Sequence, residues 1–354
     1  MFSIERASGG AREDKTRDNA YLGRRLRCVT HEGILAKVEI FLPLPMIPTA
    51  TEALASAFEV HLGWELSDAD FAEIAPRIRG IANGNGGKVD RSLIENLPAL
   101  EIVANFGVGY DSVDVAAAAE RNIIVTNTPD VLTEEVADTA IGLLLMTVRE
   151  LSAAERYLRA GRWEKEWPYR LTQGSLRNRT VGIIGLGRIG RAIARRVEAM
   201  QVPVVYHSRT QRPDAPYRYY SDLLAMAADV DTLIFVLPGG AETRHLVNSE
   251  LLKALGREGI LINIGRGSTV DEAALIEALS NGTILAAGLD VYPDEPKVSP
   301  ALIALPNAVL LPHVASASIY TRKAMGQLVV DNLTGWFERG EPVTPVPETP
   351  WPRR

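Results

Sequence analysis

One stretch, residues 180–200, constrains the fold more than any other part of this chain. A short apolar run at 181–184 leads directly into a turn that contains Gly185, Gly187 and Gly190. Apolar residues then recur at helical spacing to the end of the stretch, which predicts a helix after the turn. The order of strand, glycine turn and helix is typical of the first βαβ unit of a dinucleotide-binding domain.

The three glycines have separate physical reasons. The first permits a tight turn, the second lets the backbone approach a pyrophosphate, and the third brings the helix against the strand. The N-terminus of the helix then faces the phosphates with its free N–H groups. The motif alone is weak evidence, and a glycine-rich turn without a ligand is the alternative. A second apolar run at 204–206 supplies the next strand and favours a nucleotide site.

Composition limits the classes of function. The chain has 354 residues, of which 46% are hydrophobic, and this length suits two domains at the usual ~150 residues each. The net charge is −6, and no basic block with interleaved aromatic residues marks a nucleic-acid surface. The longest apolar stretches, such as 140–148, are too short to span a bilayer. We therefore expect neither a nucleic-acid partner nor a membrane partner.

Cysteine usage and the N-terminal segment indicate the compartment. Cys28 is the single cysteine, and no Cys/His cluster has the spacing of metal ligands. Residues 1–37 are rich in charge and lack the apolar core of a secretion signal. We expect no metal site, a mobile N-terminal extension over residues 1–37 and a cytoplasmic location.

The first half of the chain alternates strand-like and helical segments. We expect strands at 38–42, 78–82, 102–104 and 123–126, and helices at 51–58 and 91–97. Two glycine-rich loops, 83–87 and 106–111, follow strands, and in a parallel sheet such loops share the carboxyl edge, where backbone N–H groups can hold a small anion. Ordinary turn chemistry is the alternative for either loop taken alone.

A long helix is expected after the last of these strands. Thr133 can cap it, acidic residues occupy its first turn, and its pattern runs towards Leu158 until Gly161 ends it. The expected buried stripe comprises Val136, Ala140, Leu143 and Leu144. Trp163 and Trp167 follow in a polar segment, where they either anchor a linker or contact a second subunit.

Beyond the glycine turn the alternation continues. Apolar runs at 232–237, 260–264, 284–289 and 309–311 predict strands, with helices at 271–279 and 322–337. This pattern gives βαβ units and a doubly wound parallel sheet.

Three residues that could do chemistry follow successive strands of that sheet. Arg266, Glu295 and His313 stand at or just past the ends of the last three strand-like runs, so the fold would bring them to the crevice that holds the cofactor. A guanidinium binds a carboxylate and polarises an adjacent ketone, an imidazole transfers a proton, and a carboxylate beside it orients the ring. Taken singly, each residue has a structural alternative: a surface ion pair, a solvated acid or a satisfied histidine.

The order and spacing of these motifs resemble those of the D-isomer-specific 2-hydroxyacid dehydrogenases. The resemblance covers about residues 38–345 and is carried by 107–111, 127–129, 181–190, 265–267, 288–296 and 311–313. It implies two Rossmann-like doubly wound parallel-sheet domains, one flavodoxin-like and one dinucleotide-binding, with a cleft between them. Residues 38–132 with 318–354 would form the substrate domain and 133–317 the dinucleotide-binding domain, usually in a homodimer.

The resemblance also implies roles for individual residues. The catalytic residues would be Arg266, Glu295 and His313. The substrate-binding residues would be Asn85, Gly86, Val108, Gly109, Arg266 and His313, with the backbone around Val108 and Gly109 holding the substrate carboxylate. The cofactor-binding residues would be Gly185, Gly187, Arg188, Ile189, Ser208, Arg209, Thr210, Leu237, Pro238, Thr243, Ile264, Gly265, Arg266, Asp290, His313 and Ala315, with Asp290 on the nicotinamide side.

The segment after the second strand of the nucleotide unit differs from that of NAD-using relatives. Where they place an acid for the ribose hydroxyls, this chain has Ser208, Arg209 and Thr210. A carboxylate there would repel a 2′-phosphate, whereas Arg209 attracts it, so we expect NADP, with NAD as the alternative. Ala315 stands where the family commonly has glycine and leaves the catalytic groups untouched.

The expected function is NADPH-dependent, reversible reduction of a small 2-oxo acid to the D-2-hydroxy acid, since the NADP-type segment and the 106–110 loop are similar to those of glyoxylate and hydroxypyruvate reductases. Reduction of a bulkier 2-oxo acid, such as hydroxyphenylpyruvate, is one alternative. A non-catalytic scaffold that senses dinucleotides, like the corepressors that share this fold, is another.

Overall fold

The computed structural model describes residues 37–84 and 86–352. The expected N-terminal extension, apart from Lys37, and the candidate substrate residue Asn85 lie outside the described residues. No helix within the described ranges is both long enough and apolar enough to cross a membrane.

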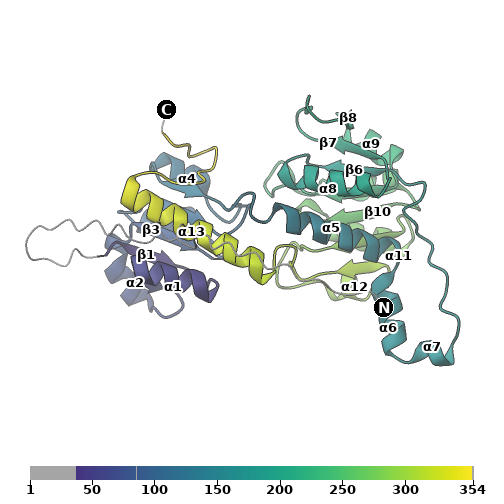
Figure 1. Cartoon of the computed structure of the whole chain (residues 1–354), viewed down its shortest axis with the longest axis horizontal. Helices are drawn as coiled ribbons and strands as arrows, with labels where there is room; N and C mark the ends of the chain where they lie inside the picture. The colour runs from purple at the N-terminus through teal and green to yellow at the C-terminus, as the bar shows by residue number, and fades with distance from the viewer. Residues whose placement is uncertain (1–36, 85, 353–354) are drawn as a thin grey trace, which may run out of the picture. The chain divides into compact units, whose positions relative to one another are not determined.

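The first of two α/β domains is built on a five-stranded parallel sheet in the order β2-β1-β3-β4-β5. Its strands are β1 (Glu39–Leu42), β2 (Glu59–Leu62), β3 (Gly80–Asn83), β4 (Ile102–Asn105) and β5 (Ile124–Thr126), and its helices are α1 (Pro48–Ala57), α2 (Asp68–Ile74), η1 (Ala75–Arg77), α3 (Arg91–Asn96), α4 (Val115–Glu120) and α13 (Ile319–Arg339). Helix α13 packs on α1, β3 and β4, so a helix from the far end of the chain covers this sheet (Figure 1).

The second domain carries a seven-stranded parallel sheet in the order β12-β11-β10-β9-β6-β7-β8. Its strands are β6 (Val181–Ile184), β7 (Val204–His207), β8 (Arg218–Tyr220), β9 (Thr232–Phe235), β10 (Ile260–Asn263), β11 (Ala286–Leu289) and β12 (Ala308–Leu310). The strand order reverses between β6 and β9, and in open parallel sheets ligands bind outside the carboxyl ends of the strands at such a point. The expected fold class, two domains with parallel sheets, is confirmed.

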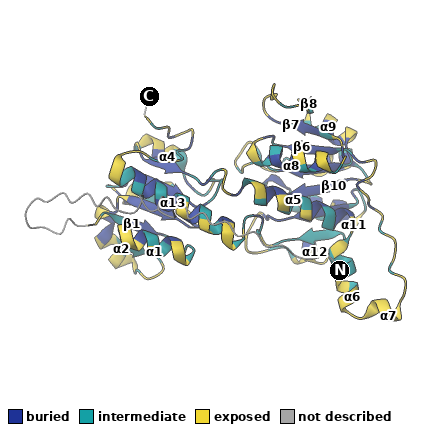
Figure 2. Cartoon of the chain, in the orientation of Figure 1, coloured by how far each residue is buried: buried dark blue, intermediate teal, exposed yellow. Residues whose placement is uncertain are grey.

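Helices cover both faces of this sheet. They are α5 (Thr133–Val148), α8 (Arg188–Ala199), α9 (Leu223–Asp229), α10 (Ser249–Leu255), α11 (Glu272–Ser280) and α12 (Pro300–Ile303), with the short η2 (Gly267–Thr269) after β10. Strands β6, β9, β10 and β11 are buried along their whole length, and Figure 2 shows β6 and β10 in dark blue. Near-continuous apolar strands of this kind are typical of parallel sheets buried on both faces.

Two edge strands were not expected from the sequence. β2 has an exposed glutamate followed by half-buried residues, and β8 reads Arg-Tyr-Tyr with an exposed first position. Edge strands pair on one side only and face solvent, so they lack the apolar run that marks a central strand. Pairing with β1 and β7 determines their structure.

The long helix predicted from Thr133 is shorter, and its cap is different. Leu132 occupies the N-cap position without a side-chain hydrogen bond, and Thr133 is the first helical residue, so the predicted threonine cap is wrong. Leu132 is buried, and the turn in which Thr133 N–H bonds the Asp130 carbonyl brings the chain into the helix. The helix ends at Val148, because Glu150 adopts a left-handed backbone with φ 52°. The predicted buried stripe is confirmed.

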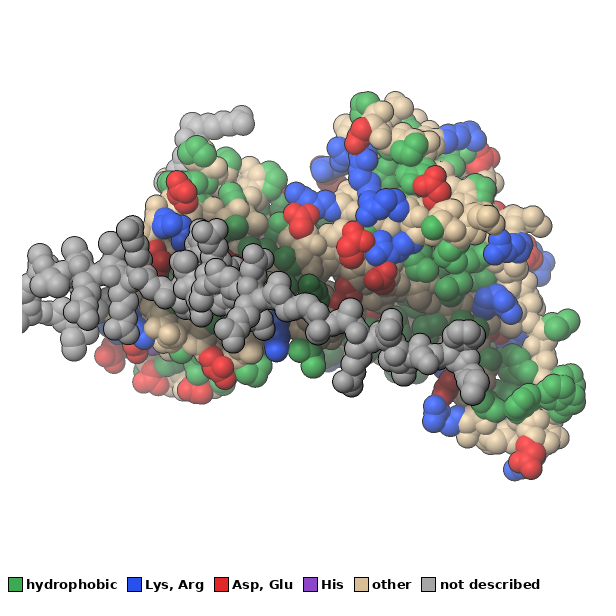
Figure 3. Space-filling model, viewed as in Figure 1, with side chains coloured by type: hydrophobic (Ala, Val, Ile, Leu, Met, Phe, Trp, Pro, Cys, Tyr) green, Lys and Arg blue, Asp and Glu red, His purple; other side chains and the backbone are tan. Residues whose placement is uncertain are grey.

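A separate pair of helices follows this break. We call α6 (Leu151–Arg159), α7 (Arg162–Lys165) and the residues up to 171 the arm. Neither helix has a buried residue, and hydrophobic side chains gather on this part of the surface (Figure 3). Trp163 and Trp167 are 47% and 69% exposed, and their ring centroids lie 5.3 Å apart.

Candidate active site

The glycine turn leaves an open approach to the N-terminus of α8. A Cβ on Gly185 would lie 2.9 Å from the Val236 carbonyl oxygen, and a Cβ on Gly190 would lie 2.0 Å from the Gly185 carbonyl oxygen. The first and third glycines are therefore required by packing. A Cβ on Gly187 would meet nothing within 4 Å, and no side chain caps this helix. Open space beside uncapped N–H groups fits a pyrophosphate.

The segment after β7 exposes a cation. Ser208 is buried, and its hydroxyl donates to the Thr210 carbonyl at 2.7 Å, which holds the turn. Arg209 extends into solvent and reaches Glu242 only at 3.5 Å. The guanidinium of Arg209 and the hydroxyl of the exposed Thr210 fit a 2′-phosphate, while Ser208 fixes the turn that carries them. Glu242 lies far along the chain, so sequence reasoning missed it.

Two further candidate loops, the first after β9 and the second after β10, pack against each other at the same edge of the sheet. A Cβ on Gly265 would lie 2.6 Å from the Leu237 carbonyl oxygen, so this glycine permits the contact. The Thr243 hydroxyl donates to the Pro238 carbonyl at 2.9 Å and folds the first loop. Ile264 is 6% exposed. Its side chain therefore belongs to the core, and only its backbone is available to a ligand.

Two other cofactor candidates lie at the start of α8. Arg188 is exposed and forms an ion pair of 2.8 Å with Asp130, whereas Ile189 is half-buried and packs against the core. The pair joins the glycine turn to the turn before α5.

A histidine and a glutamate are in direct contact. Nδ1 of His313 lies 2.6 Å from Oε2 of Glu295, and Oε1 of the same carboxylate accepts the Tyr292 N–H at 2.9 Å. Burial alone would raise the pKa of Glu295. These hydrogen bonds and the charges of His313 and Arg266 lower the pKa by more than burial raises it, so it lies below its ordinary value. Glu295 is thus an ionised acceptor, Nδ1 carries the donated proton, and Nε2 is left for another partner.

The backbone of His313 is unusual. Its φ is 53°, in the left-handed region that a non-glycine residue rarely adopts, and its N–H donates to the Asp290 carbonyl at 2.8 Å. The buried Asp290 carboxylate accepts the N–H groups of Val314 and Ala315 at 2.8 and 3.0 Å. Burial raises the pKa of Asp290, and the two N–H bonds offset only part of this rise. Asp290 therefore anchors the segment that presents the imidazole.

In the loop after β4, the carbonyl groups of Val108 and Gly109 accept hydrogen bonds, whereas their N–H groups do not donate to any described residue. The Val108 carbonyl accepts Nδ2 of Asn127 at 2.8 Å, and the Gly109 carbonyl accepts Nδ2 of Asn105 at 3.0 Å. Within the described ranges, the N–H groups of Val108 and Gly109 donate to no acceptor. Adjacent free N–H groups form an anion-binding concavity.

The other glycine loop is tied to this one by an asparagine. Nδ2 of Asn83 donates to Oδ1 of Asn105 and to the Gly87 carbonyl, each at 3.0 Å. Gly86 adopts φ 82° in between. Asn83 and Asn105 were not predicted as site residues, although each ends a strand that precedes a glycine loop, which is the signal that could have found them.

Arg266 packs against the 106–111 loop. Its Nε donates to Oδ1 of Asp111 at 2.9 Å, and a Cβ on Gly109 would lie 1.6 Å from its Nη2. Its charge also acts on Glu295. Asp111 is another residue that sequence reasoning missed, because an ion pair between positions 155 residues apart has no local pattern.

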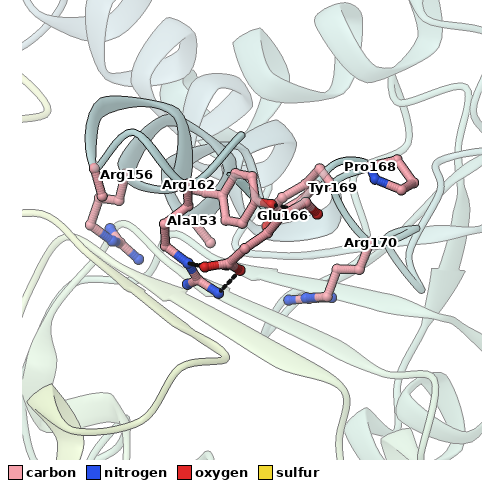
Figure 4. Close-up of a pocket in the computed structure, with 9 residues that line it drawn as sticks. Ala153, Arg156, Arg162, Glu166, Pro168, Tyr169 and Arg170 are labelled. Carbon is pink, nitrogen blue, oxygen red and sulfur yellow. Dashed lines mark hydrogen bonds and ion pairs between the residues drawn. The ribbon is translucent and has the colours of Figure 1, made fainter. Parts of the chain in front are cut away.

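Two hollows of the described surface lie on the arm. One of about 560 Å³ is lined by residues that include Arg156, Arg162, Glu166 and Tyr169 (Figure 4). Arg162 donates through Nε and Nη2 to the carboxylate of Glu166 there. A second hollow of about 510 Å³ is lined by Trp163 and Trp167 among others. None of the three catalytic candidates lines either hollow.

Comparison with known proteins gives a consistent set of relatives. Residues 141–315 match the sequence model described as D-isomer specific 2-hydroxyacid dehydrogenase, NAD binding domain. A glyoxylate/hydroxypyruvate reductase A of Arabidopsis thaliana is 48% identical over 76% of this chain and 85% of its own length. A hydroxyphenylpyruvate reductase of Plectranthus scutellarioides is 42% identical over 87% of this chain and 99% of its own.

A solved structure is similar over most of the chain. It is an NADPH-dependent glyoxylate/hydroxypyruvate reductase from Sinorhizobium meliloti in complex with NADP and malonate, with a TM-score of 0.85 and 55% sequence identity. The match covers 90% of this chain and 99% of that one.

Proposed function

The chain belongs to the D-isomer-specific 2-hydroxyacid dehydrogenase family, and we propose that it uses NADPH to reduce a small 2-oxo acid of the glyoxylate or hydroxypyruvate type to the D-2-hydroxy acid, reversibly. One observation carries this proposal: Arg266 packs against Gly109, in the loop with the two free N–H groups, and acts electrostatically on Glu295, which pairs with His313. A cation, a paired imidazole and an anion site are the groups that reduction of a 2-oxo acid requires.

The cofactor would bind along the carboxyl edge of the seven-stranded sheet. The open space at Gly187 and the first N–H groups of α8, at Arg188 and Ile189, would hold the pyrophosphate. Ser208, Arg209 and Thr210 would hold the 2′-phosphate, which favours NADPH, with NAD as an alternative. The middle of the cofactor would lie along the backbone around Leu237, Pro238, Thr243, Ile264 and Gly265. The segment from His313 to Ala315, anchored by Asp290, would border the nicotinamide. When bound, NADPH supplies the hydride.

The protein residues bind the acid and move the proton. The N–H groups of Val108 and Gly109 hold the substrate carboxylate, and Nη2 of Arg266 stabilises the negative charge that develops on the carbonyl oxygen. Nε2 of His313 donates the proton that this oxygen needs after hydride transfer. Glu295 holds the imidazole through Nδ1 and places its negative charge beside the ring.

The experiment is an absorbance assay of NADPH oxidation with glyoxylate, hydroxypyruvate, pyruvate and hydroxyphenylpyruvate. We expect the highest kcat/KM with glyoxylate or hydroxypyruvate. A preference for hydroxyphenylpyruvate would favour the second candidate, which the Plectranthus relative supports. Absence of turnover with every acid, together with NADPH binding, would favour a dinucleotide-sensing scaffold.

We also propose a homodimer in the cytoplasm, with the arm reaching the partner subunit. The exposed tryptophans and the absence of buried residues in α6 and α7 support it, since large exposed aromatic clusters mark protein contacts. The substrate domain would comprise residues 38–132 and 318–354 and the cofactor domain 133–317. A monomer in sedimentation, fully active at the same concentration, would contradict the dimer.

A further inference from the structure

We propose that Asp111 is a positioning residue for Arg266, fixing the guanidinium so that its Nη2 faces the substrate loop. The inference rests on the proposed 2-oxo acid reduction and deepens it, because it assigns a role to a residue of the loop that binds the acid.

The guanidinium is held on two sides. Its Nε donates to Oδ1 of Asp111 at 2.9 Å, and its Nη1 donates to the Gly265 carbonyl at 2.9 Å. A guanidinium is planar, and two hydrogen bonds at different nitrogens fix its plane and rotation. The remaining nitrogen, Nη2, then lies where a Cβ on Gly109 would be, 1.6 Å away. The free edge is therefore directed at the loop whose N–H groups have no acceptor in the described chain.

The surrounding glycines leave space for this arrangement. A Cβ on Gly239, in the loop after β9, would lie 3.2 Å from Oδ2 of Asp111 and 3.4 Å from Cγ of Arg266. A side chain at Gly109 would displace the guanidinium itself. Both positions lack a side chain where the ion pair sits, so the pair is packed on two sides by backbone.

Asp111 also links Arg266 to the loop proposed to bind the substrate carboxylate. It lies two residues after Gly109 in the same loop, so the loop carries both the N–H groups for the carboxylate and the acceptor that holds Arg266. The side chains of Arg266 and Asp111 are 28% and 41% exposed. An ion pair this accessible contributes little to folding stability, which favours an orienting role.

The test compares Asp111→Ala, which removes the acceptor, with Asp111→Asn, which keeps an oxygen and removes the charge. We expect Asp111→Ala to lower kcat/KM for the preferred 2-oxo acid about 10- to 100-fold, because small misplacements of a catalytic group cost this much. Asp111→Asn should recover most of the loss, and NADPH affinity should not change. The control is Glu120→Ala, which removes an exposed 2.7 Å pair with Arg91 in the same domain and should leave kcat/KM unchanged.

A double-mutant cycle identifies the route of the effect. In an Arg266→Ala background, Asp111→Ala should cause no further loss, because the residue acts through the guanidinium. An equal loss in both backgrounds, or a kcat/KM for Asp111→Ala equal to that of the wild type, would overturn the proposal.

A crystal structure of Asp111→Ala separates this proposal from the proposed function. Displacement of the Arg266 guanidinium from Gly109 supports positioning even if no 2-oxo acid is reduced, and an unmoved guanidinium overturns it even if the wild type is an active reductase.

Discussion

Nδ1 of His313 lies 2.6 Å from Oε2 of Glu295, and the same histidine has a left-handed backbone held by the Asp290 carbonyl. The side chain and the backbone of one residue are thus fixed independently. Strained backbone of this kind costs free energy and persists where the surroundings enforce it, often at functional sites. The orientation of Nε2 is therefore set before any substrate binds.

His313→Asn should abolish most turnover while the fold and NADPH binding persist. Asparagine tolerates the left-handed backbone, so the variant removes the imidazole without adding strain. Loss of a general acid lowers kcat about 10²- to 10⁴-fold. Steady-state kinetics and NADPH titration measure the two effects, and a variant that keeps wild-type kcat would exclude His313 as the proton donor.

Glu295→Gln should move the basic limb of the reductive pH profile to lower pH. The variant keeps a hydrogen-bond acceptor for Nδ1 but loses the negative charge beside the ring. The profile of kcat/KM against pH, measured beside the wild type, checks this. An unchanged basic limb with intact turnover would show that Glu295 does not tune the donor.

The unfolding free energy of Glu295→Gln should depend on pH differently from that of the wild type. The pKa of Glu295 is lowered from its ordinary value of 4.5, so its pairing stabilises the folded state fully above that value. This contribution is lost as pH falls through the lower folded value. The unfolding free energies of wild type and Glu295→Gln should therefore differ near neutral pH and converge in acid, as denaturant titrations would show; a difference that grows towards acid would contradict it.

Gly187→Ala and Gly190→Ala should differ in their effect on folding stability. Apart from its chain neighbours, a methyl group at 187 meets no atom of the described residues within 4 Å, so the variant should fold normally and lose NADPH affinity. A methyl group at 190 would lie 2.0 Å from the Gly185 carbonyl oxygen, so that variant should also lose stability, by about 1–3 kcal/mol for overpacking. Thermal melts and NADPH titrations separate them, and normal NADPH affinity in Gly187→Ala would refute the pyrophosphate position.

Arg209 and Glu242 should have opposite effects on cofactor affinity. Arg209→Ala should weaken NADPH binding about tenfold, the usual scale of a charge-assisted hydrogen bond, and leave NADH binding unchanged. Glu242→Gln should tighten NADPH binding, because the carboxylate 3.5 Å away competes for the guanidinium and repels the phosphate. Titrations with both cofactors check this; equal losses of NADPH and NADH in Arg209→Ala would contradict the assignment.

The sequence was informative where chemistry is local. The glycine turn after β6 and the central strands carry their signal in a few neighbouring residues, and both sheets were expected. Arg266, Glu295 and His313 were singled out because each follows a strand, and their catalytic roles stay predictions. The structure adds that two of them are in hydrogen-bond contact.

What the sequence missed depends on contacts between distant positions. The Asp111–Arg266 pair and the asparagine links between the two glycine loops join separate strands, and no local pattern encodes them. The break at Glu150 was missed because it contains neither glycine nor proline. The threonine cap failed because a buried leucine fixes where the helix enters the core.

The segment after α13 returns to the five-stranded sheet. Pro345 bridges Thr126 in antiparallel orientation, Val346 N–H donates to the Val125 carbonyl at 2.9 Å, and the Thr349 hydroxyl accepts the Val125 N–H at 2.9 Å. In chain order, this segment follows the whole seven-stranded sheet, whereas β5 precedes that sheet. During synthesis, residues 345–349 can therefore pair with β5 only after the second domain has been translated.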